Sequence, residues 1–183
     1  MVIAYLGWGS LVWDPRGLPI RGGWHQDGPL LPIEFARQSD DDRITLVLSQ
    51  GRALVRALWA LLSAESLAEA REALRIGEGV LKKNETRDIA DSPSGGGEGE
   101  IAERIRVWAK AAGIDCVVWT NLGEKFDGQE KAPTMAEVVS YLSGLPHEKR
   151  VHAERYIRMA PRQIDTEYRR RIEFELGWTP LSE

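Results

Sequence analysis

Residues 2–11 read VIAYLGWGSL, a short apolar stretch that runs into two glycines separated by a tryptophan. The β-branched and aromatic side chains of residues 2–6 predict a buried strand, and Gly7 and Gly9 predict a turn where it ends. Backbone N–H groups in a glycine turn can bind a carboxylate, a phosphate or the oxyanion that forms when an amide carbonyl is attacked. Ser10 adds a hydroxyl group. The same pattern is also typical of a turn that only ends a strand.

The first half of the chain is expected to be rich in strands. Residues 14–32 contain many glycines and prolines, which predicts an irregular loop. Leucine and alanine then recur at helical spacing over residues 63–76, which predicts a helix capped by Ser63 or Ser66. Between these two segments, β-forming residues predict a meander of strands in a small curled sheet, at residues 31–37, 43–48 and 53–62.

The second half is expected to be mostly helical. Residues 91–100 read DSPSGGGEGE, a composition that predicts a mobile surface loop. A buried strand is expected at residues 114–120. Apolar periodicity predicts four helices around this strand, at residues 101–112, 134–143, 147–159 and 161–176.

This order of elements favours an α+β fold, because several strands precede most of the helices. A doubly wound α/β sheet would need strands and helices in strict alternation, which the first half lacks. The length of 183 residues predicts one domain, 1–183, with a helical C-terminal part at about residues 134–176.

The composition limits the classes of function. Hydrophobic residues make up 43% and charged residues 28% of the chain, which excludes wholesale disorder. The 24 basic and 28 acidic residues give a net charge of −4, without the basic surplus that nucleic-acid binding needs. The single Cys116 excludes an internal disulfide. No leader pattern and no apolar run of about 18 residues is present, so we expect a cytoplasmic protein that does not bind membranes.

Among the titratable residues, Glu78 is the strongest candidate for chemistry. It follows the predicted helix 63–76 and lies between Gly77 and Gly79, close to the apolar Val80. A carboxyl group in such surroundings can have a raised pKa, which suits a general base or acid, although a glutamate in a surface turn has the same pattern. The three histidines show no i, i+4 pair, and we expect no metal site.

Two of these segments resemble known elements of one superfamily. Residues 5–11 (YLGWGSL) resemble the N-terminal signature of the gamma-glutamylcyclotransferase-like superfamily, in which a buried strand runs into a Tyr-Gly-Ser-Asn or Tyr-Gly-Ser-Leu loop. Residues 74–80 (LRIGEGV) are similar to its later Leu-Asp-x-x-Glu-Gly-Val element, whose glutamate is catalytic. The resemblance covers roughly the first 80 residues.

The resemblance implies a small curled β-barrel with surrounding helices, and an enzyme that cyclises a γ-glutamyl group to 5-oxoproline. The free α-amine attacks the γ-carbonyl, and an amino acid, peptide or amine leaves. Glu78 would be the catalytic residue that moves the proton. Trp8, Gly9, Ser10 and Leu11 would bind the substrate, mainly through backbone amides. The reaction needs no cofactor, because the nucleophile is part of the substrate.

One departure from the signature keeps a second interpretation open. Trp8 stands where the superfamily usually has a tyrosine, so a hydroxyl group is missing at that position. A non-catalytic domain of the same fold that binds a small molecule is therefore the alternative, and a hydrolase or transferase of another kind is a third. The leaving group and the oligomeric state stay open.

Overall fold

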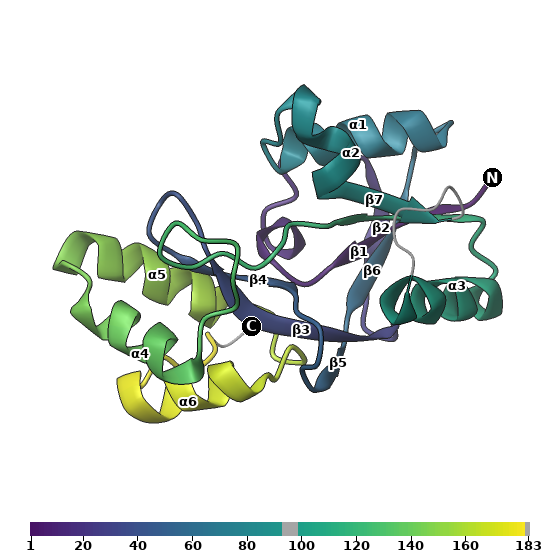
Figure 1. Cartoon of the computed structure of the whole chain (residues 1–183). Helices are drawn as coiled ribbons and strands as arrows, with labels where there is room; N and C mark the ends of the chain where they lie inside the picture. Colours follow the sequence, from purple (N-terminus) through teal and green to yellow (C-terminus); the bar gives the residue numbers. More distant parts are fainter. Residues whose placement is uncertain (93–98, 182–183) are drawn as a thin grey trace. The chain divides into compact units, whose positions relative to one another are not determined.

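The apolar stretch at the N-terminus forms β1 (Ile3–Gly7; Figure 1). It is the central strand of a five-stranded sheet in the order β2-β6-β1-β8-β7. The computed structural model describes residues 1–92 and 99–181. β1 pairs antiparallel with β6 (Leu58–Leu62) and parallel with β8 (Cys116–Thr120). The edge strands are β2 (Ile20–His25) and β7 (Ile89–Ser92). All five residues of β1 are buried, as expected for a central strand with neighbours at both edges.

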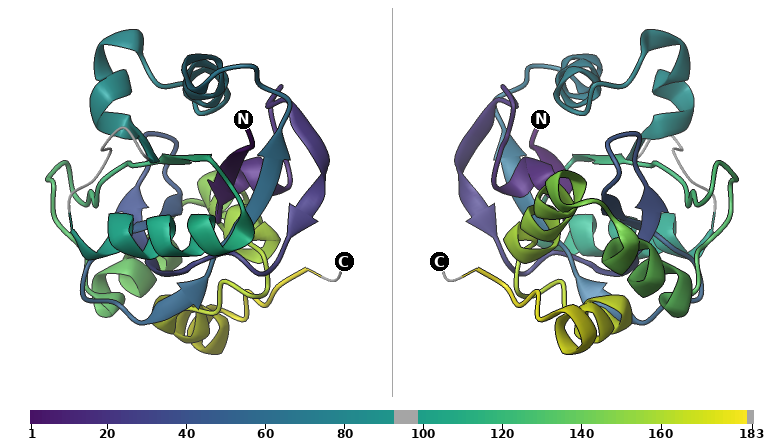
Figure 2. Two further views of the ribbon diagram at one scale, coloured as in Figure 1. Left: turned by 90° about the vertical axis from the view of Figure 1, so that its right-hand side faces the viewer. Right: turned by 90° about the vertical axis from the view of Figure 1, so that its left-hand side faces the viewer.

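Two helices cover this sheet, α1 (Leu67–Gly77) on one face and α3 (Glu100–Ala112) on the other (Figures 1 and 2). Successive side chains of a strand point to opposite faces, so alternate residues of β1 and β8 meet different helices. The cluster beneath α1 combines α1 residues with strand residues of one parity, and its members include Ile3, Tyr5, Ala70, Leu74, Cys116 and Val118. α1 begins at Ser66, whose hydroxyl accepts from the backbone N–H of Glu69.

The chain forms two compact units, each built from two stretches of sequence. The five-stranded sheet belongs to the first unit, residues 1–31 and 56–122; the second holds residues 32–55 and 123–183. A three-stranded sheet with the order β4-β3-β5 belongs mainly to the second unit. Its strands are β3 (Leu30–Gln38), β4 (Ile44–Leu48) and β5 (Leu54–Arg56), and its helices are α4 (Met135–Gly144), α5 (His147–Met159) and α6 (Glu167–Leu176).

The α+β class is confirmed, but the expected barrel is wrong, because the strands of residues 1–92 and 99–181 form two sheets and neither closes into a barrel. The predicted strand 53–62 is interrupted at Ala57, whose N–H donates to the carbonyl of Pro29 at 3.0 Å. Its two parts, β5 and β6, belong to different sheets.

The structure contains two strands, β2 and β7, that the sequence does not predict. β2 lies inside residues 14–32, which the sequence predicts to be an irregular loop. The register of its pairing with β6 shifts between Arg21 and His25. Gly22 lies in this stretch and has φ +81°. The glycines that predict a loop therefore form a bulge within a strand. β7 follows two short helices, η2 (Lys82–Asn84) and α2 (Glu85–Asp88). Residues 93–98 of the expected loop lie outside the described residues.

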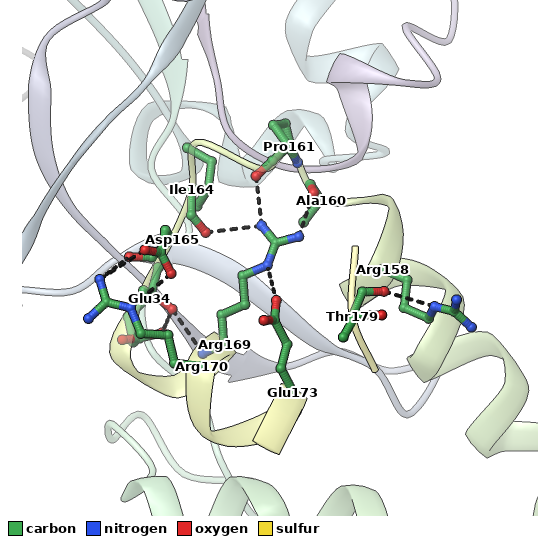
Figure 3. A network of polar contacts seen from close by, with 11 residues as sticks. Glu34, Arg158, Ala160, Pro161, Ile164, Asp165, Arg169, Arg170, Glu173 and Thr179 are labelled. Atoms are coloured by element: carbon green, nitrogen blue, oxygen red, sulfur yellow. Dashed lines mark hydrogen bonds and ion pairs between the residues drawn. The ribbon is translucent and has the colours of Figure 1, made fainter. Parts of the chain in front are cut away.

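The last predicted helix begins later than expected. The sequence predicts one helix over residues 161–176, but α6 begins at Glu167, and Thr166 caps it by accepting from the N–H of Arg169. The Arg169 side chain donates to the carbonyl oxygens of three preceding residues, Ala160, Pro161 and Ile164 (Figure 3). These carbonyl groups accept hydrogen bonds from the Arg169 side chain, and the residues between α5 and α6 form a turn.

A buried carboxyl group from β3 supports the same end of α6. Glu34 is 2% exposed, and its carboxylate accepts from the N–H of Phe35 at 2.8 Å, from the Thr166 hydroxyl and from the N–H of Tyr168 at 3.3 Å. Burial raises the pKa of Glu34, while these hydrogen bonds act in the opposite direction. The raised pKa means that removal from water outweighs the hydrogen bonds.

This burial predicts a pH dependence of stability. A folded-state pKa above the unfolded value makes the folded protein bind the proton more tightly, so the stabilisation is full below the ordinary pKa of 4.5 and is lost as the pH rises through the folded pKa. Urea unfolding between pH 4 and pH 7 should show wild type losing stability relative to Glu34→Gln, which does not titrate. Glu167→Gln, an exposed neighbour, is the control and should follow wild type. Parallel curves for Glu34→Gln and wild type would contradict the expectation.

Candidate active site

Glu78 lies at the C-terminal end of α1, as its flanking glycines predicted. It is the C-cap residue, with φ −86° and ψ −3°, and its N–H donates to the carbonyl of Leu74 at 2.9 Å. Gly79 follows in the left-handed conformation with φ +67°. The N–H of Gly79 donates to Ile76 and that of Val80 to Arg75, which together form a Schellman motif. Gly79 is therefore needed for the turn that fixes the Glu78 backbone.

Gly77 brings Glu78 close to the N-terminal turn. A Cβ atom at Gly77 would lie 3.7 Å from the side chains of Leu11 and Leu18 and 3.9 Å from the carbonyl oxygen of Arg16. The end of α1 thus packs directly on the segment that follows β1. The two glycine-flanked motifs, which are about 70 residues apart in the sequence, meet at this contact.

Thr120 holds the Glu78 side chain at one end of the sheet. Its hydroxyl donates to Oε1 of Glu78 at 2.9 Å. Thr120 is the last residue of β8, which runs parallel to β1 with Tyr5 opposite Val118. Two residues further along, the register brings Thr120 level with Gly7, the last residue of β1. Glu78 and the turn after β1 therefore lie at the carboxyl ends of two adjacent parallel strands, where open α/β sheets commonly bind ligands.

The turn after β1 contains backbone N–H groups that donate no hydrogen bond to any residue that the structure describes. Gly9 precedes the short helix η1 (Ser10–Val12), and the N–H of Val12 donates to the carbonyl of Gly9 at 3.0 Å. Within residues 1–92 and 99–181, the N–H groups of Gly9, Ser10 and Leu11 donate no hydrogen bond to the protein. The Ser10 hydroxyl accepts from Nη2 of Arg16.

Two of the predicted substrate-binding residues have their side chains in the core. Trp8 is 5% exposed and Leu11 is 1% exposed, and Leu11 belongs to the cluster beneath α1. Both can therefore meet a ligand mainly through their backbone. Gly9 and Ser10 are partly exposed. Gly7 is needed for packing, because a Cβ there would lie 2.6 Å from the ring of Trp24.

Two polar residues at this site, Arg16 and Thr120, are not predicted from the sequence. Arg16 lies in the loop rich in glycine and proline, and Thr120 ends an apolar run, so neither has a local pattern that indicates chemistry. Only the packing of α1 against the loop and the pairing of β8 with β1 bring them beside Ser10 and Glu78.

A salt-bridge network surrounds the outer side of α1 and α2. The side chains of Arg75 and Lys82 both donate to the carboxylate of Glu72 and lower its pKa to about 2. Arg71 forms ion pairs with Glu85 and with the buried Asp91. These pairs connect α1 with the segment from η2 to β7. We assign the network to holding that segment in place.

A cavity of about 640 Å³ lies elsewhere in the first unit, beside α3. Its lining is mostly apolar and includes Pro29, Leu30, Val107 and Trp108, but none of the predicted site residues. The indole N–H of Trp108 donates to the backbone carbonyl of Asp27 at 3.1 Å. This cavity is therefore separate from the residues that gather around Glu78.

Within residues 1–92 and 99–181, no three His, Cys, Asp or Glu side chains gather where they could hold a metal ion. No helix in the same part of the chain combines the length and apolar character needed to cross a bilayer. His25 stacks on the ring of Trp59, with the ring centroids 4.2 Å apart.

None of the protein-family models compared with the chain matches it, and no protein of curated function is significantly similar to it in sequence. Functional inference therefore depends on the geometry around Glu78.

Proposed function

We propose that the chain is a γ-glutamyl-cyclising enzyme, which converts a γ-glutamyl group to 5-oxoproline and releases an amino acid, peptide or amine. The observation that supports this most directly is that Gly77, the residue before Glu78, packs on Leu11 of the Gly9–Leu11 turn, while Thr120 binds the Glu78 side chain at the end of β8. Glu78 supplies a carboxylate that can accept a proton, the turn supplies backbone donors that can hold an oxyanion, and the reaction needs both groups.

In the proposed reaction the α-amine of the substrate attacks its own γ-carbonyl carbon. The new C–N bond closes a five-membered lactam, and the negative charge that develops on the carbonyl oxygen is stabilised by the N–H groups of Gly9, Ser10 and Leu11. Glu78 takes a proton from the attacking amine and delivers it to the leaving nitrogen as the original amide bond breaks. The proton count balances without a cofactor, and the nucleophile is held in place by its own chain.

The position of Glu78 on its helix is a second argument for a chemical role. The C-terminal end of a helix carries partial negative charge and favours cations. A carboxylate at the C-cap of α1 is therefore unfavourable for stability, and Arg75 one turn earlier is the residue type expected there. A negative charge placed against the preference of a helix C-terminus is more readily explained by function than by folding.

Incubation of the purified protein with a panel of γ-glutamyl amino acids, peptides and amines tests the proposal. We expect 5-oxoproline and the free amine in equal amounts for at least one class of leaving group, measured by mass spectrometry. Amine release without 5-oxoproline would instead indicate a hydrolase or transferase. Well-folded protein that forms no product from any member of the panel would overturn the proposal.

The alternative function is a non-catalytic domain that binds a small γ-glutamyl compound. The side chain of Trp8 favours this alternative, because it is buried and supplies no hydroxyl group to the site. Calorimetric binding of a γ-glutamyl peptide without turnover over hours would support it, and measurable 5-oxoproline would exclude it.

A further inference from the structure

The side chain of Arg16 places a positive charge beside the Gly9–Leu11 turn. Its Nη2 donates to the Ser10 hydroxyl, and its Nε lies 3.5 Å from the carbonyl oxygen of Asp14. Within the described residues, Nη1 donates no hydrogen bond. In the same part of the chain its guanidinium pairs with the carboxylate of Asp14, at the 4.0 Å limit of an ion pair, and the Asp14 side chain is 65% exposed. Such an exposed pair is weak, so the guanidinium can bind another anion.

The backbone of Arg16 also lies close to the end of α1. A Cβ atom at Gly77, the residue before Glu78, would be 3.9 Å from the Arg16 carbonyl oxygen. Arg16 has a left-handed backbone with φ +47°, and Gly17 continues the turn with φ +83°. The loop thus doubles back at this point, between the Ser10 hydroxyl on one side and the end of α1 on the other.

A guanidinium at the turn after β1 and a carboxylate at the end of α1 that packs on this segment form a pair of opposite charges that matches the head group of an α-amino acid. The α-carboxylate and α-amine of a γ-glutamyl group are bonded to the same carbon atom, so the protein groups that bind them must be neighbours. A guanidinium can bind a carboxylate through two parallel hydrogen bonds. The carboxylate of Glu78 at the end of α1 would repel a phosphate or a dicarboxylate but would attract an ammonium group.

We infer that Arg16 binds the α-carboxylate of the substrate and selects α-amino acid γ-amides over amides that lack this carboxylate. The inference depends on the proposed function. Bound in this way, the α-amine faces Glu78 and the γ-carbonyl extends toward the turn. Arg16 is thus a specificity-determining residue, and Ser10 orients it by accepting from Nη2.

A pair of substrates that differ only in the α-carboxylate tests this role. Both γ-glutamyl p-nitroanilide and 4-aminobutanoyl p-nitroanilide can cyclise through their free amines, to 5-oxoproline and 2-pyrrolidinone respectively, with release of p-nitroaniline. Wild type should prefer the first substrate by about 100-fold in kcat/KM, which corresponds to the loss of charged hydrogen bonds. Arg16→Met should lose this preference by reacting more slowly with the carboxylated substrate, and its kcat/KM for the other substrate should stay within about threefold of wild type.

Arg16→Lys provides the matched comparison. Both variants keep a long L side chain at φ +47°, so their backbone strain is the same and only the charge differs. Lysine should restore part of the preference, within roughly tenfold of wild type, because it keeps the charge but not the paired donors. An equal loss on both substrates in Arg16→Met, or no preference in wild type, would overturn the role of Arg16 alone. No lactam from either substrate with wild type would overturn the proposed function and this inference with it.

Discussion

Replacement of Glu78 by glutamine is expected to lower kcat/KM for 5-oxoproline formation by about 10²- to 10⁴-fold, the range for loss of a general base. Glutamine has nearly the same shape and can still accept from the Thr120 hydroxyl through its side-chain oxygen, but it cannot take the proton from the attacking amine. The rate is measured by mass spectrometry of 5-oxoproline with the best substrate of the panel.

The same variant should remain folded, which separates catalysis from stability. Removal of a negative charge from the C-terminal end of α1 is expected to leave the melting temperature unchanged or slightly higher. Glu65→Gln, an exposed glutamate just before α1, is the control and should keep full activity. Wild-type rates in Glu78→Gln would show that this carboxylate does not carry the proton.

Thr120 can be tested as a positioning residue in the same assay. Thr120→Val keeps the branched shape but removes the hydroxyl that donates to Oε1 of Glu78, and we expect roughly a tenfold lower kcat/KM. Thr120→Ser restores the hydroxyl and should recover most of the rate. Equal activity in the valine and serine variants would mean that the hydrogen bond does not position Glu78 for the reaction.

Replacement of Arg169 by methionine is expected to cause the largest loss of stability, about 3–5 kcal/mol of unfolding free energy. Arg169 is 1% exposed, and its guanidinium donates to Ala160 and Pro161 at 2.8 and 2.7 Å and to Glu173 at 3.0 Å (Figure 3). Methionine would fill much of the space but would leave these carbonyl oxygens and the carboxylate without their donor. For a chain of this size the melting temperature should fall by roughly 10 °C.

The neighbouring arginine is a matched control. Arg170 forms an ion pair with Asp165 at 2.9 Å, but its side chain is 64% exposed, so Arg170→Met should cost less than about 1 kcal/mol. Urea unfolding followed by circular dichroism compares the two variants directly. Similar losses in both would show that Arg169 contributes no more than a surface ion pair, despite its burial.

Local patterns predicted much of the fold correctly. The buried strand at the N-terminus, the helix at residues 147–159 and the C-terminal position of Glu78 on its helix all follow from short stretches of sequence. Each depends on interactions within a few residues, such as helical periodicity or the left-handed Gly79. The predicted roles of Glu78 and of residues 8–11 in binding and catalysis stay predictions.

The errors occurred where distant residues decide the structure. The glycine-rich segment around Gly22 forms the edge strand β2 because it pairs with β6. The predicted strand 53–62 is divided because the N–H of Ala57 donates to the carbonyl of Pro29. The start of α6 depends on Thr166 and on the buried Arg169, whose carbonyl partners lie before the helix. Composition and periodicity contain no information about such partners.

The sequence by itself determined the two glycine-flanked motifs, since the conformations of Gly79 and of the turn at Gly9 depend on local backbone geometry. Only the tertiary structure decided that these motifs meet, because the contact of Gly77 with Leu11 and the parallel pairing of β8 with β1 join segments far apart in the chain. The same packing brought Thr120 to Glu78 and placed Arg16 beside both motifs. Long-range burial of apolar surface, which no short pattern describes, holds these segments together.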